Sequence, residues 1–111
     1  MMGGDYAPLE AVRGVGLYLA GHNIPATLHL IGNKAIIEKQ LSENNIPAEN
    51  IRVVHAEQVI DMHEHPTKAL KEKQQSSIAI GFQLLATGKM DAFISAGNTG
   101  AMLVGALFSL K

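Results

Sequence analysis

A turn rich in small residues separates an apolar run from an apolar helix near the end of the chain. Its residues suited to ligand binding are Ser95, Gly97, Asn98, Thr99 and Gly100. Glycine has no Cβ, so backbone N–H groups can approach a ligand closely at those positions. Asn98 or Thr99 can cap the following helix, whose start presents unpaired N–H groups and a positive partial charge. The turn is therefore a candidate site for an anion such as phosphate, although turn geometry and capping alone also explain these residues.

A second group of residues suited to an anion precedes another predicted helix. Lys73 stands shortly before the pair Ser76 and Ser77. Serine hydroxyls can donate hydrogen bonds to phosphate oxygens or cap the helix, and lysine supplies positive charge. Three lysines between positions 68 and 73 are also typical of a solvated helix face, so both interpretations stay open.

Histidines are concentrated in one polar connection, which includes His55, His63 and His65. Asp61 and the last two of these resemble metal ligands in type. A His-x-His pair in a polar stretch is more typical of a solvated loop, so we predict no metal site. His55 follows a strand, where active sites of α/β proteins gather, and it is the one histidine considered as a catalytic candidate.

Composition excludes several classes of function. Nine Lys and Arg residues against ten Asp and Glu residues give a net charge of −1, which does not favour a nucleic-acid partner. Cysteine is absent, which excludes disulfides and thiolate chemistry and agrees with a cytoplasmic location. No Lys-Ser or Lys-Thr follows Gly100, so the turn is not a P-loop, and the spacing of Gly97, Gly100 and Gly105 does not match the dinucleotide fingerprint.

Hydrophobic periodicity predicts alternating helices and strands in one domain. The predicted helices begin near residues 9, 33, 66, 78 and 101, and the predicted strands are 26–32, 51–54 and 92–94. This alternation, with an apolar fraction of 47% and only 5% aromatic residues, favours a parallel sheet flanked by helices. The apolar stretch 101–110 is shorter than the roughly 20 residues of a membrane span.

Several blocks of sequence resemble one enzyme family across nearly all 111 residues. The family is that of the bacterial phosphate acyltransferases of phospholipid synthesis. The matching residues are Met2 to Pro8, Val53 to Ala56, Pro66, Ala69, Lys71, Lys73, Ser76, Ser77 and Asp91 to Ala101. The stretch from Ser95 to Gly100 is the most specific of these blocks.

The resemblance implies a three-layer α/β/α sandwich with a mostly parallel sheet, similar to phosphotransacetylases and isopropylmalate-type dehydrogenases. It implies transfer of an acyl group from acyl carrier protein to inorganic phosphate, giving acyl phosphate, in a cytoplasmic homodimer that contacts the membrane surface. In the family a strand precedes the Met-Gly-Gly-Asp block, and the chains continue well beyond position 111. We therefore expect residues 1–111 to be the amino-terminal part of one acyltransferase domain, without its first strand and carboxyl-terminal part.

The resemblance and the physical suitability of the residues together suggest roles. Phosphate can attack a thioester directly, so no nucleophilic side chain and no cofactor are expected. The residues predicted to hold phosphate or acyl phosphate, or to form the adjoining wall, are Gly3, Gly4, Asp5, Lys73, Ser76, Ser77, Ser95, Gly97, Asn98, Thr99 and Gly100. His55 and Asn98 are the only candidates for a catalytic group, and no general base is assigned.

Two alternatives remain at this stage. A phosphotransacetylase-like enzyme would use coenzyme A in place of the carrier protein. A non-catalytic α/β module would bind phosphate and catalyse nothing.

Overall fold

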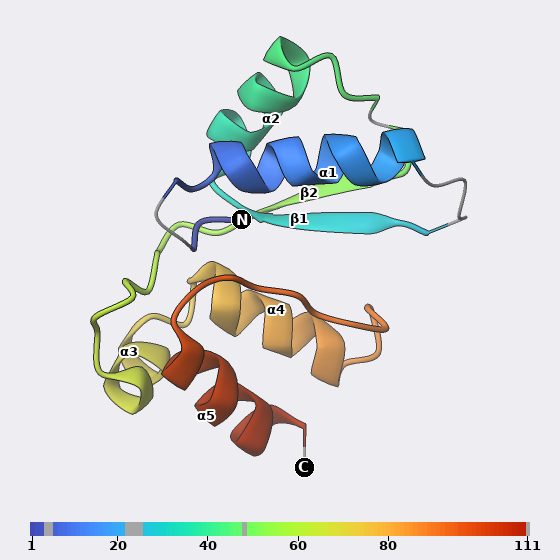
Figure 1. Ribbon diagram of the computed structural model, residues 1–111. Helices are drawn as coiled ribbons and strands as arrows, with labels where there is room; N and C mark the ends of the chain where they lie inside the picture. The colour runs from blue at the N-terminus through green and yellow to red at the C-terminus, as the bar shows by residue number, and fades with distance from the viewer. Residues whose placement is uncertain (4–5, 22–25, 48, 111) are drawn as a thin grey trace.

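The chain alternates helices and strands, as the periodicity predicts. The computed structural model describes residues 1–3, 6–21, 26–47 and 49–110. Its elements are α1 (Leu9–Gly21), β1 (Leu28–Gly32), α2 (Lys34–Glu43), β2 (Ile51–His55), α3 (Pro66–Glu72), α4 (Ser77–Ala86) and α5 (Thr99–Ser109). Helices α1 and α2 lie on one side of the two strands, and α3, α4 and α5 lie on the other (Figure 1). The predicted α/β class is confirmed.

The described strands form a two-stranded parallel sheet, so each has one edge that pairs with no other strand. Leu28 is opposite Ile51, and Gly32 is opposite His55. The N–H of Leu28 donates to the Asn50 carbonyl at 2.8 Å, so residues 28, 30 and 32 direct their backbone groups towards β2. The intervening His29 and Ile31 direct theirs to the opposite edge. There the terminal amine of Met1 donates to the Ile31 carbonyl at 2.9 Å.

Two separate hydrophobic clusters form the core, and only the first includes residues of the strands. The first joins α1 and α2 to β1 through Val12, Leu30, Ile37 and Leu41. The second joins the other three helices and the chain before α3; its buried members are Ile60, Ala69, Ile78, Phe82 and Ala101. Burial of each such side chain stabilises the fold by about 1.5–3 kcal/mol when the residue is large. The second cluster fixes the starts of α4 and α5, where the candidate site lies.

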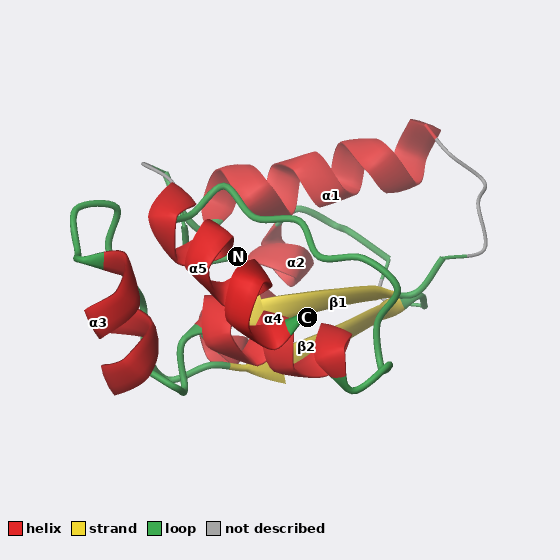
Figure 2. Ribbon diagram, turned by 90° about the horizontal axis from the view of Figure 1, so that it is seen from below, coloured by secondary structure: helices red, strands yellow, loops and turns green. Residues whose placement is uncertain are grey.

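The prediction of a strand at residues 92–94 is wrong. These residues belong to the loop that returns from α4 to α5 (Figure 2), which lies below the strands, at the level of α4, in Figure 1. Phe93 turns inward and meets Phe82 edge-on, with ring centroids 5.1 Å apart, whereas Ile94 is 93% exposed. Among the described residues this loop pairs with neither β1 nor β2, and the sheet has two strands.

Candidate functional site

The start of α4 carries two serines, one of which caps the helix. Ser76 is fully buried, and its hydroxyl accepts the N–H of Ala79 at 3.2 Å. Ser77 is 8% exposed. Among the described residues its N–H and hydroxyl have no hydrogen-bond partner. Within the described residues, Gln40 Oε1 is the one fully buried side-chain atom that has no hydrogen-bond partner. The Ser77 hydroxyl also has no partner, so it must still reach solvent. Ser77 is thus available to a ligand, and Ser76 stabilises the helix start.

The start of α5 is capped by Asn98, which is 3% exposed. Its Oδ1 accepts the N–H of Ala101 at 3.0 Å. Its Nδ2 donates to the carbonyls of Asp61 at 2.9 Å and Glu64 at 3.0 Å. The polar atoms of this side chain are therefore engaged within the protein. The N–H groups of Thr99 and Gly100 have no acceptor in the described part of the chain, as expected at a helix start.

Gly97 brings the two helix starts together. A Cβ on Gly97 would lie 3.2 Å from Cδ1 of Ile78, the residue after Ser77. Its N–H donates to the Ser95 hydroxyl at 3.0 Å. The backbone of Gly3 lies so close to Gly97 that a Cβ on Gly3 would overlap the Cα of Gly97. The start of the chain therefore does adjoin the glycine turn; the neighbouring Gly4 and Asp5, also predicted there, lie outside the described residues.

Gly100 has a packing role that the sequence did not indicate. A Cβ at this position would overlap Cγ of Pro66, the first residue of α3. The absence of a side chain lets α5 and α3 approach at their amino-terminal ends. Close approach to the protein itself thus explains this glycine, whether or not a ligand also approaches it.

Lys73 is paired within the protein. Its Nζ lies 2.5 Å from Oε1 of Glu64 and 2.8 Å from the Val59 carbonyl. The hydrogen bond from Lys73 holds the pKa of the Glu64 carboxyl below its ordinary value, and a bond from the Asp61 N–H acts in the same direction. The charge predicted to assist phosphate binding is compensated here, so the proposed role of Lys73 stays a prediction.

Glu64 connects the predicted residues, and sequence reasoning missed it. Its carboxylate binds Lys73 and its carbonyl binds Asn98. The sequence singled out other residues of this segment, Asp61, His63 and His65, as possible metal ligands. Among the described residues no three histidine or acidic side chains gather as a metal site would require. The sequence held only a weak signal for Glu64: a carboxylate nine residues before a lysine.

His55 lies at the end of β2 and contacts a different helix. It is exposed, and its Nδ1 accepts the N–H of Lys34, the first residue of α2, at 3.2 Å. This bond stabilises the start of α2. It gives His55 a structural role, and its catalytic role stays a prediction.

The amino-acid sequence is similar to the sequences of known proteins. A family described as "Fatty acid synthesis protein" matches residues 1–111. The chain belongs to this family. Proteins named phosphate acyltransferase are 46% identical in Dictyoglomus turgidum, 42% in Thermoanaerobacterium thermosaccharolyticum and 38% in Myxococcus xanthus, over 98% of this chain in each case. The chain spans about a third of these relatives, from 30% to 32% of their length.

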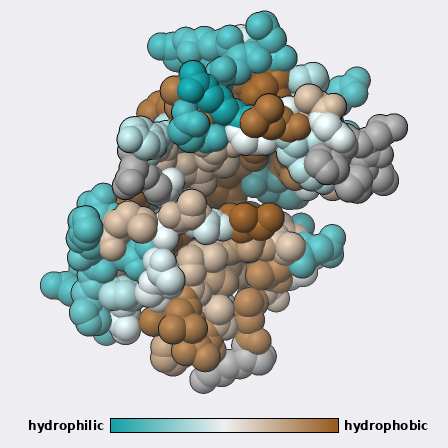
Figure 3. All heavy atoms as spheres, in the orientation of Figure 1, coloured by the Kyte–Doolittle hydropathy of each residue, from teal (hydrophilic) through white to brown (hydrophobic). Residues whose placement is uncertain are grey.

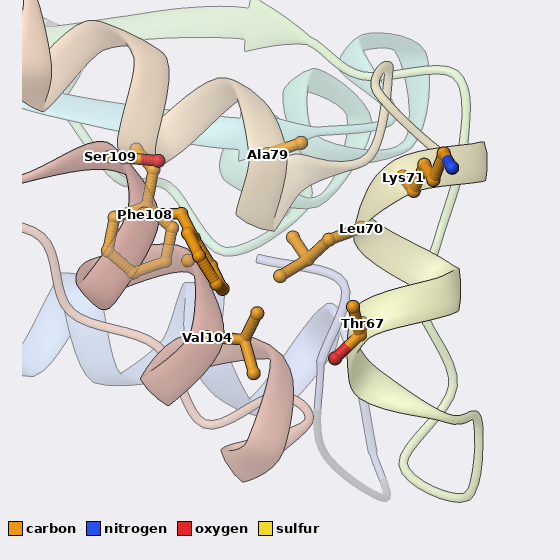
Figure 4. Close-up of a pocket in the computed structure, with 9 residues that line it drawn as sticks. Thr67, Leu70, Lys71, Ala79, Val104, Phe108 and Ser109 are labelled. Atoms are coloured by element: carbon orange, nitrogen blue, oxygen red, sulfur yellow. The ribbon is translucent and has the colours of Figure 1, made fainter.

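Two cavities in this family member lie away from the paired helix starts. One, of about 300 Å³, is lined mainly by apolar side chains of α3, α4 and α5, including Leu70, Val104 and Phe108 (Figure 4). The other, of about 410 Å³, lies between α2 and the outer edge of β2. Neither is lined by a residue predicted to bind phosphate. The candidate anion site is therefore a set of N–H and hydroxyl donors at two helix starts, outside both cavities.

Apolar side chains gather on α5 as well as in these cavities. Leu103, Leu107 and Phe108 are more than half exposed, and brown surface covers this end of the molecule in Figure 3. No helix within the described ranges is long and apolar enough to cross a membrane.

Proposed function

We propose that this chain supplies part of the phosphate site of an acyltransferase that converts acyl-[acyl carrier protein] and inorganic phosphate to acyl phosphate. One observation carries the proposal: the starts of α4 and α5 meet at Gly97, where N–H groups of both helices and the Ser77 hydroxyl have no partner in the part of the chain that the structure describes. Two helix starts attract a dianion, each by about 0.3–1 kcal/mol where exposed. Membership of the fatty acid synthesis protein family and the names of the relatives support the same reaction class.

The reaction requires positioning more than a protein nucleophile. A phosphate oxygen attacks the thioester carbonyl, a C–O bond forms, and the C–S bond breaks as the carrier thiolate leaves and takes up a proton. The N–H groups of Thr99, Gly100 and Ser77, with the Ser77 hydroxyl, would hold the phosphate oxygens that do not react. Fixing phosphate in this way replaces its hydration by oriented dipoles and lowers the entropic part of the barrier.

The larger assembly is proposed from the resemblance. We expect the full-length enzyme to be a three-layer α/β/α sandwich with more parallel strands, to form a homodimer in the cytoplasm, and to contact the membrane surface. Helices on both sides of the two strands in Figure 1 support the layered part of this proposal. Acyl carrier protein would be its partner, and contact with the membrane would be made through regions that the 111 residues do not include.

Phosphate titration of serine variants tests the proposed site. We expect Ser77→Ala to weaken phosphate binding about tenfold, as expected for loss of a hydrogen bond to a charged group, and to leave the unfolding free energy unchanged. Ser76→Ala should lower the unfolding free energy by about 1 kcal/mol through loss of the cap. Ser42→Ala, on the exposed side of α2, is the matched control for both measurements.

Isothermal titration calorimetry with inorganic phosphate measures the first effect, and urea unfolding measures the second. Unchanged phosphate affinity in Ser77→Ala would remove this hydroxyl from the site. Acyl phosphate formation by the corresponding full-length variants, with acyl carrier protein thioester and acyl-coenzyme A compared as donors, separates the proposed enzyme from a phosphotransacetylase. Phosphate binding without turnover on either donor would favour a non-catalytic binding module.

A further inference from the structure

The side chain of Asn98 joins two parts of the chain that are more than 30 residues apart. Its Nδ2 donates to the carbonyls of Asp61 and Glu64, and the Met62 carbonyl lies 3.5 Å from the same atom. Capping of α5 needs only Oδ1, so the Nδ2 bonds are additional to the cap. The Asn98 side chain is 3% exposed, and the bonds that it makes to the exposed Asp61 and the half-buried Glu64 attach this segment to the start of α5.

The segment 61–66 forms a wall beside the start of α5. Asn98 holds its carbonyl groups, and the ring of Pro66 lies directly against Gly100. On its other side the carboxylate of Glu64 accepts both the Lys73 ammonium and the N–H of Asp61, which fixes the shape of this loop. A shift of the loop would therefore move the groups next to the N–H of Gly100.

We propose that Asn98 is a positioning residue for the anion site, and this inference rests on the proposed function. Its Nδ2 holds the loop 61–66 against α5, which keeps the N–H groups of Thr99 and Gly100 in the geometry that phosphate requires. Asn98 itself does not contact phosphate, because both polar ends of its side chain are occupied. The role first expected of this side chain, as a direct ligand, is replaced by an indirect one.

Replacement by serine separates the two roles of Asn98. Serine caps helices about as well as asparagine but has no amide donor for the loop, and it adds no charge. Asn98→Ser should thus keep the cap on Ala101 and release the loop, whereas Asn98→Ala should lose both. Asn33→Ser is the matched control, because Asn33 caps α2 through the N–H of Ile36 at 3.2 Å and its amide donates to no loop among the described residues.

Amide hydrogen exchange and phosphate titration of the 111-residue chain provide the test. In Asn98→Ser we expect exchange across residues 61–68 to accelerate about tenfold and phosphate affinity to fall about tenfold, each equivalent to loss of one or two hydrogen bonds. Exchange at the Ala101 amide should stay slow, which shows that the fold and the cap are intact. Asn33→Ser should change none of these three readouts.

Each result decides one part of the inference. Unchanged exchange in residues 61–68 of Asn98→Ser would overturn the tether. Faster exchange there with unchanged phosphate affinity would overturn the positioning role. If the unaltered chain binds no phosphate, the proposed function fails, and positioning of a phosphate site fails with it; the exchange data then decide the tether alone.

Discussion

Replacement of Gly100 by alanine distinguishes close packing of two helices from close approach of a ligand. A Cβ at this position would overlap Cγ of Pro66. Overpacking of this kind costs roughly 1–3 kcal/mol, and alanine in a helix regains at most about 1 kcal/mol relative to glycine. We therefore expect Gly100→Ala to lower the unfolding free energy by up to about 2 kcal/mol.

Gly14 provides the control for helix propensity, because it lies in α1 with no atom within 4 Å of its missing Cβ. Gly14→Ala should raise the unfolding free energy by about 1 kcal/mol. The difference between the two variants, measured by urea unfolding, then isolates the overlap with Pro66. In a Pro66→Ala background, where Cγ is absent, the cost of Gly100→Ala should fall by about 1 kcal/mol or more.

Two results would refute this reasoning. One is a Gly100→Ala protein as stable as Gly14→Ala, since no overlap would then exist. The other is an equal cost of Gly100→Ala with and without the ring of Pro66. If stability is unaffected while phosphate affinity is lost, Gly100 is needed for the ligand, as the sequence first suggested.

Three further outcomes follow from the structure. Lys73 lowers the pKa of Glu64, so the ionised carboxylate stabilises the fold at pH values above its ordinary pKa of about 4.3. This stabilisation is lost as the pH falls through the folded-state pKa. Glu64→Gln should therefore flatten the acid limb of a profile of stability against pH. Gly105→Ala should destabilise by roughly 1–3 kcal/mol in urea, because a phenylalanine ring fills the space of its Cβ. Amide exchange along β1 should alternate, with His29 and Ile31 faster than residues 28, 30 and 32, and uniform protection would contradict the open edge.

The helices and the two paired strands could be predicted because their signals are local. The apolar spacing that indicates α1 and α2 also forms their buried side, as Val12 and Ile37 show. Residue type and position predicted caps from the pairs Ser76 or Ser77 and Asn98 or Thr99; the structure selects Ser76 and Asn98, and both accept the N–H three residues further on. Such features depend on a few neighbouring residues, so a single sequence determines them.

Pairing of a strand depends on a distant partner, and here the prediction was wrong. Residues 92–94 have the composition of a buried strand, yet among the described residues they pair with neither β1 nor β2. Their contact is with α4 instead, where the ring of Phe93 meets Phe82 and lies against Gly81. The hydrophobicity of a segment therefore indicates that it can enter a sheet, and the neighbouring strand decides whether it does.

The same distinction between local and distant partners explains the candidate site. Sequence reasoning selected glycine, serine and asparagine as groups that could surround an anion, and Gly3, Gly97 and Ser77 do lie around the paired helix starts. It could not foresee that Asn98 would bind carbonyl groups of residues 61–64, or that Lys73 would pair with Glu64. Both interactions join residues that are distant in the sequence and come together only in the fold. Two side chains predicted to bind phosphate, Asn98 and Lys73, thus make their bonds to the segment 59–64. The donors left for the proposed anion site are the Ser77 hydroxyl and backbone N–H groups, whose presence at a helix start follows from secondary structure alone.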